Sequence, residues 1–142
     1  MRAPSILTLL FVAAPCLAQT EPLTIKGVGL GDSIDKMGQI GICALNRGGM
    51  CVGKTEYGPI AEANFIAWYV AGKITEITVT FDPRFSATVF EGLTRRFGES
   101  SPTGCKPGVT GCHTWKYSGT SLTLLETVGA VRLTRQAPAD GY

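Results

Sequence analysis

The chain has 142 residues, of which 44% are hydrophobic and 17% are charged, so we expect one domain with its own core and not two. Lys and Arg outnumber Asp and Glu by 13 to 11, and these charges are spread along the sequence without a run. Because nucleic acids and anionic lipids are bound by clustered basic side chains, this balance argues against either as the main partner.

Residues 1–18 have the pattern of a secretory signal peptide. One basic residue precedes an apolar run, and Ala18 is the small residue after which cleavage is expected. The apolar run is too short to cross a bilayer of about 30 Å, and no later segment is suitable. A lipid anchor on Cys16 is the alternative, but Pro15 stands where a lipoprotein signal needs a small residue. We therefore expect a periplasmic or secreted protein whose single domain is formed by residues 19–142.

Two short elements are expected in the first third of the mature chain. Residues 23–28 are predicted as a strand. The glycines after it are predicted as a turn and not as a phosphate-binding loop, because Asp32 stands where the phosphate-binding fingerprint needs glycine. Asp32 or Ser33 can cap a short helix that ends at Gly41. Residues 42–52 are predicted as a tethered loop or a bent strand, and a polar turn follows.

The clearest strand and the clearest helix of the sequence follow one another directly. Side chains in residues 60–70 alternate between two faces, which predicts a strand. Ala71-Gly72 suits a hairpin turn to a second strand over residues 73–81. In that second strand, Ile74 is the one apolar residue on the polar face. Helical spacing then puts five apolar side chains on one stripe, and Gly98 ends the helix. The five are Phe85, Val89, Phe90, Leu93 and Phe97.

Three more strands are expected after a loop rich in Pro, Gly and Ser. Residues 113–117, 120–125 and 130–135 are separated by Ser-Gly and Val-Gly turns, which predicts a meander. The order of strands and helices lacks regular βαβ alternation. It therefore indicates an α+β domain, an antiparallel sheet of about five or six strands with two helices packed on one face.

Four cysteines follow the signal peptide, and an even number in an exported chain indicates disulfides, for which three connectivities are possible. We predict Cys43–Cys51 and Cys105–Cys112, because each pair encloses a short loop rich in glycine and polar residues. A zinc site is the alternative, but the spacings are not those of zinc knuckles and His113 is the only histidine. Neither a metal nor another cofactor is expected.

No group of catalytic residues stands out. His113 is the only side chain that acts as a base near neutral pH, so a serine or cysteine hydrolase would have to use it. No serine lies in a G-x-S-x-G turn, and Glu62 and Glu76 are expected on the solvent face of strands. We therefore expect a protein that is not an enzyme. A small secreted hydrolase that uses His113 or a pair of carboxylates is the competing class.

Two surfaces are candidates for binding. A loop closed by Cys105 and Cys112 loses little entropy on docking, and it would present exposed side chains on a pre-ordered surface. The sheet could also display aromatic area for a partner. The candidate binding residues are Lys106, Pro107 and an exposed His113 at the loop, with Trp115 and Trp68 on the sheet.

Part of the sequence also suggests a family. A strand leads through Gly27-Val28-Gly29-Leu30-Gly31-Asp32-Ser33 into a short helix ending at Ile40-Gly41, and a later strand reads Thr114-Trp115-Lys116-Tyr117. This combination resembles the small outer-membrane assembly proteins of the BamE (SmpA/OmlA) type. The resemblance implies an α+β fold of two helices on an antiparallel sheet and an accessory, non-enzymatic role.

A second resemblance concerns the later cysteine loop. Cys105-Lys106-Pro107 and the closing Cys112 are similar to the disulfide loop of the Ivy-type periplasmic lysozyme inhibitors, although His113 lies just outside the loop here. The two-helix plan with a displayed sheet is also similar in outline to the secreted β-lactamase inhibitor proteins. These resemblances imply, as an alternative function, inhibition of a secreted hydrolase such as lysozyme or β-lactamase. The main expectation is an exported protein that binds another protein in the cell envelope.

Overall fold

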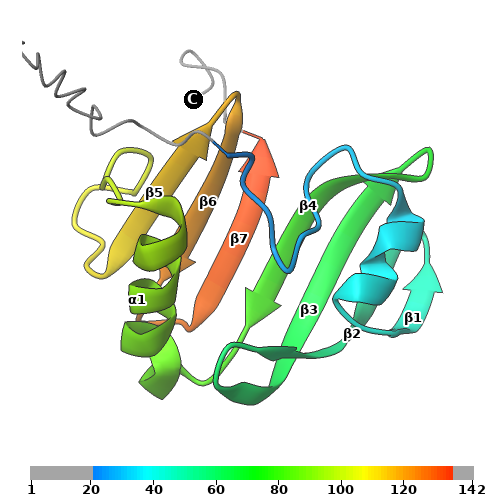
Figure 1. Ribbon diagram of the computed structural model, residues 1–142, viewed down its shortest axis with the longest axis horizontal. Helices are drawn as coiled ribbons and strands as arrows, with labels where there is room; N and C mark the ends of the chain where they lie inside the picture. The colour runs from blue at the N-terminus through cyan, green and yellow to red at the C-terminus, as the bar shows by residue number, and fades with distance from the viewer. Residues whose placement is uncertain (1–20, 136–142) are drawn as a thin grey trace, which may run out of the picture.

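A computed structural model describes residues 21–135, and the predicted signal peptide lies outside these residues. Seven strands form one antiparallel sheet in the order β1-β2-β3-β4-β7-β6-β5 (Figure 1). Their bounds are β1 (Cys43–Arg47), β2 (Met50–Tyr57), β3 (Ile60–Val70), β4 (Lys73–Thr80), β5 (Cys112–Tyr117), β6 (Thr120–Leu125) and β7 (Ala130–Arg135). Within residues 21–135, no helix has the length and apolar character needed to cross a membrane.

The predicted pair of helices on a sheet of five or six strands is wrong. The described chain contains one α-helix, α1 (Ser86–Phe97), which follows the 3-10 turn η2 (Pro83–Phe85). The segment expected as the first helix is instead the six-residue 3-10 helix η1 (Ile34–Gln39), capped by the Ser33 hydroxyl. Gly38 within it disfavours helix, and so short a segment makes too few hydrogen bonds to offset the cost of helix nucleation.

The additional strands come from the segment between η1 and β3. Residues 42–52, predicted as a tethered loop or a bent strand, and the polar turn after them form the β1–β2 hairpin. Gly48 and Gly49 both have positive φ and make its two-residue turn. Gly53 is needed inside β2, because a Cβ there would lie 2.7 Å from the Phe65 ring. The strand expected over residues 23–28 is reduced to a single bridge.

A β-bulge in β4 explains why Ile74 broke the expected alternation. Trp68 pairs with Glu76, whereas the next residue, Tyr69, pairs with Ile74, so Thr75 is an extra residue in β4. The Thr75 hydroxyl donates to the Trp68 carbonyl at 3.2 Å. Because the extra residue shifts the alternation by one, Ile74 turns into the core, where it is 1% exposed.

The sheet consists of two similar halves. In each half a helical segment is followed by a three-stranded meander: η1 precedes β2–β4, and α1 precedes β5–β7. The last strands of the two meanders, β4 and β7, pair antiparallel at the centre of the sheet. Each disulfide joins the segment after the helical element to the outer strand of that meander, through Cys51 in β2 and Cys112 in β5. The halves are therefore related by an approximate two-fold axis through the β4–β7 pair, and β1 is extra.

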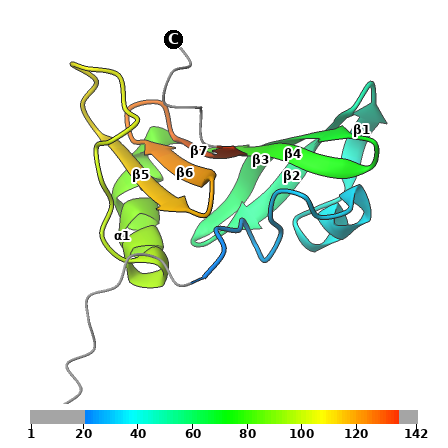
Figure 2. The same ribbon diagram turned by 90° about the horizontal axis from the view of Figure 1, so that it is seen from above.

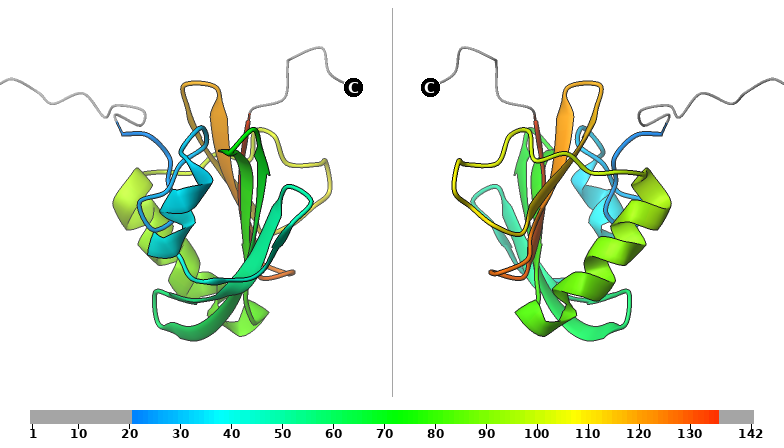
Figure 3. Two further views of the ribbon diagram at one scale, coloured as in Figure 1. Left: turned by 90° about the vertical axis from the view of Figure 1, so that its right-hand side faces the viewer. Right: turned by 90° about the vertical axis from the view of Figure 1, so that its left-hand side faces the viewer.

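Both helical elements lie on the same face of the sheet, with residues 21–33 between them (Figures 1 and 2). The predicted stripe is confirmed for Val89, Leu93 and Phe97, which are buried against this face, while Phe85 and Phe90 are half-buried. The core residues from the strands that are fully buried include Phe65, Ala67, Ile77, Val79, Leu122, Leu124, Val131 and Leu133. No helix of the described chain covers the other face (Figure 3), which we call the uncovered face.

The first prediction tests the packing of α1. Leu93→Ala should lower the free energy of unfolding by about 2–5 kcal/mol, because it empties a site that is 8% exposed beneath the helix. Thr78→Ala on the uncovered face is the control and should change it by no more than about 0.5 kcal/mol. Urea unfolding followed by circular dichroism measures both, and equal effects would contradict the packing of α1 on the sheet.

Asp32 stabilises the turn that precedes η1. Its carboxylate accepts a hydrogen bond from the Gly29 amide at 2.8 Å and lies 3.3 Å from Lys36 Nζ. The Gly29 hydrogen bond is the main cause that lowers the pKa of Asp32 below its ordinary value of 3.8; Lys36 adds to it, and partial burial opposes it. A pKa lowered by folding contributes stability above the unfolded pKa, and that contribution is lost as the pH falls through the folded pKa.

The second prediction follows from this pH dependence of the stabilisation by Asp32. Asp32→Asn should destabilise the protein at pH 7, because the charged acceptor for the Gly29 amide is lost. The difference from the original protein should shrink as the pH falls below the unfolded pKa of Asp, about 3.9, toward the lower folded pKa of Asp32. Chemical unfolding of both proteins at pH 7 and pH 3 provides the measurement. A difference that stays the same at both pH values would mean that the carboxylate charge is unimportant.

Candidate functional site

Both predicted disulfides are present, Cys43 with Cys51 and Cys105 with Cys112. They lie near the two edges of the sheet, because β1 and β5 are the edge strands. Figures 2 and 3 show that the connection from α1 to β5 and the turn of the β1–β2 hairpin both extend to the side of the sheet away from α1 and η1. The uncovered face is thus bordered by the 105–112 loop at one edge and by the β1–β2 turn at the other, while Cys51 itself, opposite the buried Ala67, lies in the core on the helical side.

The 105–112 loop presents exposed side chains, as the sequence predicts. Lys106, Pro107 and Val109 are all exposed, and Val109 was not among the candidates. The Val109 amide donates to the Lys106 carbonyl at 3.1 Å, and the Cys105 amide donates to the carbonyl of Pro102 at 3.0 Å. These hydrogen bonds and the disulfide hold the loop in one conformation, so it supplies a pre-ordered projection with one cation and one apolar side chain.

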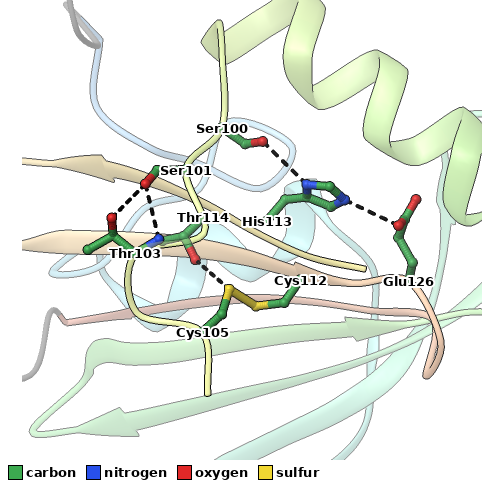
Figure 4. Close-up of a disulfide and its surroundings, with 8 residues drawn as sticks. All are labelled: Ser100, Ser101, Thr103, Cys105, Cys112, His113, Thr114 and Glu126. Carbon is green, nitrogen blue, oxygen red and sulfur yellow. Dashed lines mark hydrogen bonds and ion pairs between the residues drawn. A yellow bond between two sulfur atoms is a disulfide. The ribbon is translucent and has the colours of Figure 1, made fainter. Parts of the chain in front are cut away.

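His113 is not exposed beside this loop as expected; its side chain is only 24% exposed. Its ring stacks on Phe90 of α1, with 4.0 Å between the ring centroids. Its Nδ1 lies 3.4 Å from Ser100 Oγ and its Nε2 lies 3.2 Å from Glu126 Oε2. Figure 4 shows the ring between these two side chains. His113 therefore connects β5, the end of α1 and the β6–β7 turn.

Glu126 strengthens the same junction through its backbone. Its amide donates to the Gly111 carbonyl at 2.9 Å, and its carbonyl accepts from the buried Ser86 hydroxyl at 2.7 Å. A Cβ on Gly111 would lie 2.9 Å from the Glu126 carboxylate, so glycine is required there both for this approach and for its positive φ. The Glu126 backbone thus fixes the start of α1 and the end of the disulfide loop to the β6–β7 turn.

Ser100, His113 and Glu126 form a row with the residue types of a catalytic triad, but two backbone donors that follow Ser100 are engaged within the chain. A hydrolase needs backbone or side-chain donors aimed at the developing oxyanion. The Ser101 amide, next to the serine hydroxyl, already donates to the Thr114 carbonyl at 2.8 Å, and the Thr103 amide donates to Ser101 Oγ. Because these donors are engaged within the chain, the geometry favours a structural role for His113.

The two tryptophans lie on opposite faces of the sheet. Trp115 is 2% exposed, and its Nε1 donates to the Gly98 carbonyl at 2.8 Å, so it packs under the end of α1. It does not display the aromatic surface that was expected of it. Trp68 is 42% exposed and points to the uncovered face. Of the two aromatic candidates, only Trp68 is available to a partner.

Apolar side chains from three neighbouring strands lie on one side of Trp68, while Glu76 of β4 is its neighbour on the other. The strand register places Leu45, Val52 and Ile66 in one row across β1, β2 and β3, and Met50 opposite Trp68 in the next row. Leu45 is 38% exposed, and the other three are half-buried. We call these five residues the apolar patch. Sequence reasoning missed it because it depends on β1 and β2, which were not predicted as strands.

The remainder of the uncovered face is polar. The row through Ile66 continues across the sheet to Thr78, Arg132 and Thr123. Arg132 Nε pairs with the Glu76 carboxylate at 3.2 Å, close to the seam between the two halves. The apolar patch is therefore confined to the β1–β3 half of the face and has a polar border, an arrangement typical of protein interfaces.

Two grooves on the opposite, helical face run along α1 and meet at Tyr57 and Leu93. The first, of about 320 Å³, lies between α1 and the β2–β3 turn, and the second, of about 350 Å³, lies between the end of α1 and residues 24–27. Burial raises the pKa of Tyr57 to about 12, so its hydroxyl stays protonated at neutral pH. These grooves contain none of the residues predicted for binding.

Among residues 21–135, no three His, Cys, Asp or Glu side chains are grouped so that they could hold a metal ion. The four cysteines in this part of the chain are all disulfide-bonded. Comparison of the chain with protein-family models, curated proteins and solved structures found no match. The function therefore has to be argued from the geometry of the surfaces described above.

The third prediction tests the structural role of His113. His113→Ala should lower the free energy of unfolding by about 1–2 kcal/mol, because it removes the stack on Phe90 and the hydrogen bond to Glu126. Ser100→Ala, which removes only the long 3.4 Å contact, should change stability by about 0.5 kcal/mol or less. Thermal unfolding monitored by calorimetry decides the matter. An unchanged melting temperature for His113→Ala would contradict this role.

Proposed function

We propose that this chain is an exported, non-enzymatic protein that binds another protein on the uncovered face of its sheet. The observation that carries the proposal is the exposure of Trp68 beside the other apolar residues of the patch, on a face that no helix of the described chain covers. Interface centres are rich in aromatic residues and methionine and poor in charge, as the patch is. An exposed tryptophan among apolar neighbours is also a typical position for a residue that dominates binding energy.

The rigidity of the surface supports the same proposal. Trp68 and its neighbours belong to paired strands, and the disulfides restrain the hairpin at one edge and the 105–112 loop at the other. A surface that is ordered before binding loses little conformational entropy when the partner docks. The loop residues Lys106, Pro107 and Val109 would form a second contact on the same side of the molecule.

The compartment proposed is the periplasm or the outside of the cell. The signal-peptide pattern at residues 1–18 and the two disulfides both support an oxidising compartment. The partner would then be a protein of the cell envelope or a secreted enzyme. The resemblance to BamE-type proteins suggests an accessory role in the envelope, without enzymatic activity.

Inhibition of a secreted hydrolase is the second candidate function. The observation that favours it is the projection of the rigid 105–112 loop beyond the sheet edge, with Lys106 and Pro107 exposed on it. A rigid loop of this kind suits insertion into an enzyme cleft. Lysozymes are the enzymes to assay first, because the Ivy-type inhibitors, whose disulfide loop the 105–112 loop resembles, act on them. β-Lactamases come second, because the two-helix plan behind that resemblance is absent from the described chain.

The fourth prediction tests the binding surface. Mature protein immobilised on a support should capture a partner from envelope extract, and the purified partner is then titrated against variants. Trp68→Ala should weaken binding by roughly tenfold or more, because it removes the exposed aromatic side chain. Lys106→Ala should have a smaller effect if the loop is only a secondary contact. The same variants are to be tested for inhibition of lysozyme and β-lactamase.

Val128→Ala is the matched control, because Val128 is an exposed apolar residue, 62% exposed, on the β6–β7 turn of the other half. It should leave the affinity unchanged. All variants should retain the melting temperature of the original protein within a few degrees, since none of the three side chains is buried. Equal affinities for the original protein, Trp68→Ala and Lys106→Ala would exclude both surfaces as the binding site.

A further inference from the structure

The helical face has a feature that its own packing does not explain. Gly92 lies in the middle of α1 and lines the groove between α1 and the β2–β3 turn. A Cβ at Gly92 would meet no atom within 4 Å, so no neighbouring group requires a glycine there. Glycine is nevertheless among the least favourable residues inside a helix. The helix surface is thus kept bare where the groove passes, which leaves room for a molecule from outside the chain.

The charges along the two grooves are unequal. In the first groove Arg95 pairs with Glu91 at 2.9 Å, so the two charges cancel there. The second groove is lined by Lys26 and Arg96 and by no carboxylate. Lys26 Nζ donates to two neutral oxygens of β2, each at 2.9 Å, and Arg96 lies over the ring of Phe97 without a carboxylate partner among residues 21–135. One end of the combined groove is therefore cationic.

Both grooves have apolar as well as polar lining residues, and they differ in net charge. Val89 and Leu93 of α1 line the end that carries no net charge. Tyr57 lies where the two grooves meet. At the cationic end, Thr24 Oγ1 is buried and has no hydrogen-bond partner in the described chain.

We propose that the two grooves together form a binding site for a medium-chain fatty-acid carboxylate. The alkyl chain would lie along Gly92 and Leu93, and the carboxylate would lie between Lys26 and Arg96. The helix rises by roughly 14 Å from Thr88 to Phe97, which is about the length of an extended chain of ten carbons. The volumes of about 320 and 350 Å³ are in the range of small-molecule sites, which often lie at the seam between structural units.

This site is independent of the proposed protein-binding surface, because it lies on the other face of the sheet. The test uses the mature, oxidised protein and three ligands that share a ten-carbon chain, decanoate, decanol and decyltrimethylammonium, each below its micelle concentration. Isothermal titration calorimetry should show saturable binding of one decanoate per chain. Decanol and decyltrimethylammonium should bind at least tenfold more weakly, because they lack the anionic group that pairs with Lys26 and Arg96.

Two variants locate the site. Gly92→Leu fills the groove and should weaken decanoate binding at least tenfold, while the melting temperature stays the same or rises because leucine favours helix. Gly38→Leu is its control, since Gly38 also faces open space but lies in η1, outside these two grooves. Arg96→Gln should remove the preference for decanoate over decanol. Arg84→Gln is the matched control, because Arg84 also lies over the ring of the following phenylalanine.

Specific outcomes would overturn the proposal. Absence of saturable decanoate binding to the original protein does so directly. Gly92→Leu with unchanged affinity and unchanged fold means that any decanoate bound lies elsewhere. Equal affinity for all three ligands, or a preference for decanoate that survives Arg96→Gln, means that the cationic end does not select a carboxylate. Failure of this test would leave the protein-binding proposal untouched, because Trp68 and its neighbours lie on the other face.

Discussion

The pairing of β4 with β7 is the contact on which the remainder of the structure depends. It joins Ile77 to Leu133 and Val79 to Val131, all fully buried, and it is the only strand pair between the two halves in the described chain. Because the pair is antiparallel, the approximate two-fold axis through it is perpendicular to the sheet. Such an axis keeps each face on its own side. Both helical elements therefore cover one face. The disulfides do not follow this symmetry, because Cys51 lies opposite the buried Ala67 on the helical side, whereas Cys112, next to the inward-facing His113, lies on the other side.

The two faces consequently offer different chemistry. The helical face buries the core and leaves narrow grooves along α1, which suit a small ligand. The uncovered face is broad, and its exposed apolar area is concentrated around Trp68 on β3. A broad face with a local apolar patch suits a protein partner. The loop junction at His113 belongs to neither surface; it holds the end of α1, the start of β5 and the β6–β7 turn together.

The sequence predicted those elements whose periodicity is undisturbed. Alternation identified β3 and the final meander, helical spacing identified the stripe of α1, and cysteine spacing identified both disulfides. It failed where one residue alters the pattern, as Thr75 does in the β4 bulge. It also failed for β1 and β2, because their glycines suggest a loop. Gly48 and Gly49 instead form the hairpin turn, and Gly53 leaves room for the Phe65 ring. The apolar patch depends on those two strands, so of its members only Ile66 and Trp68, both on β3, could be placed on one face from the sequence.

Each disulfide joins cysteines that are consecutive in the mature sequence and that lie within one half. In a chain that enters an oxidising compartment N-terminus first, the earlier pair can therefore be oxidised before the later cysteines emerge. If the chain is exported as proposed, pairing in order of appearance would yield the native connectivity without correction by a disulfide isomerase. The cross-links impose no order on the joining of the halves. That step can wait until β7 has emerged, because β4 finds its central partner only then.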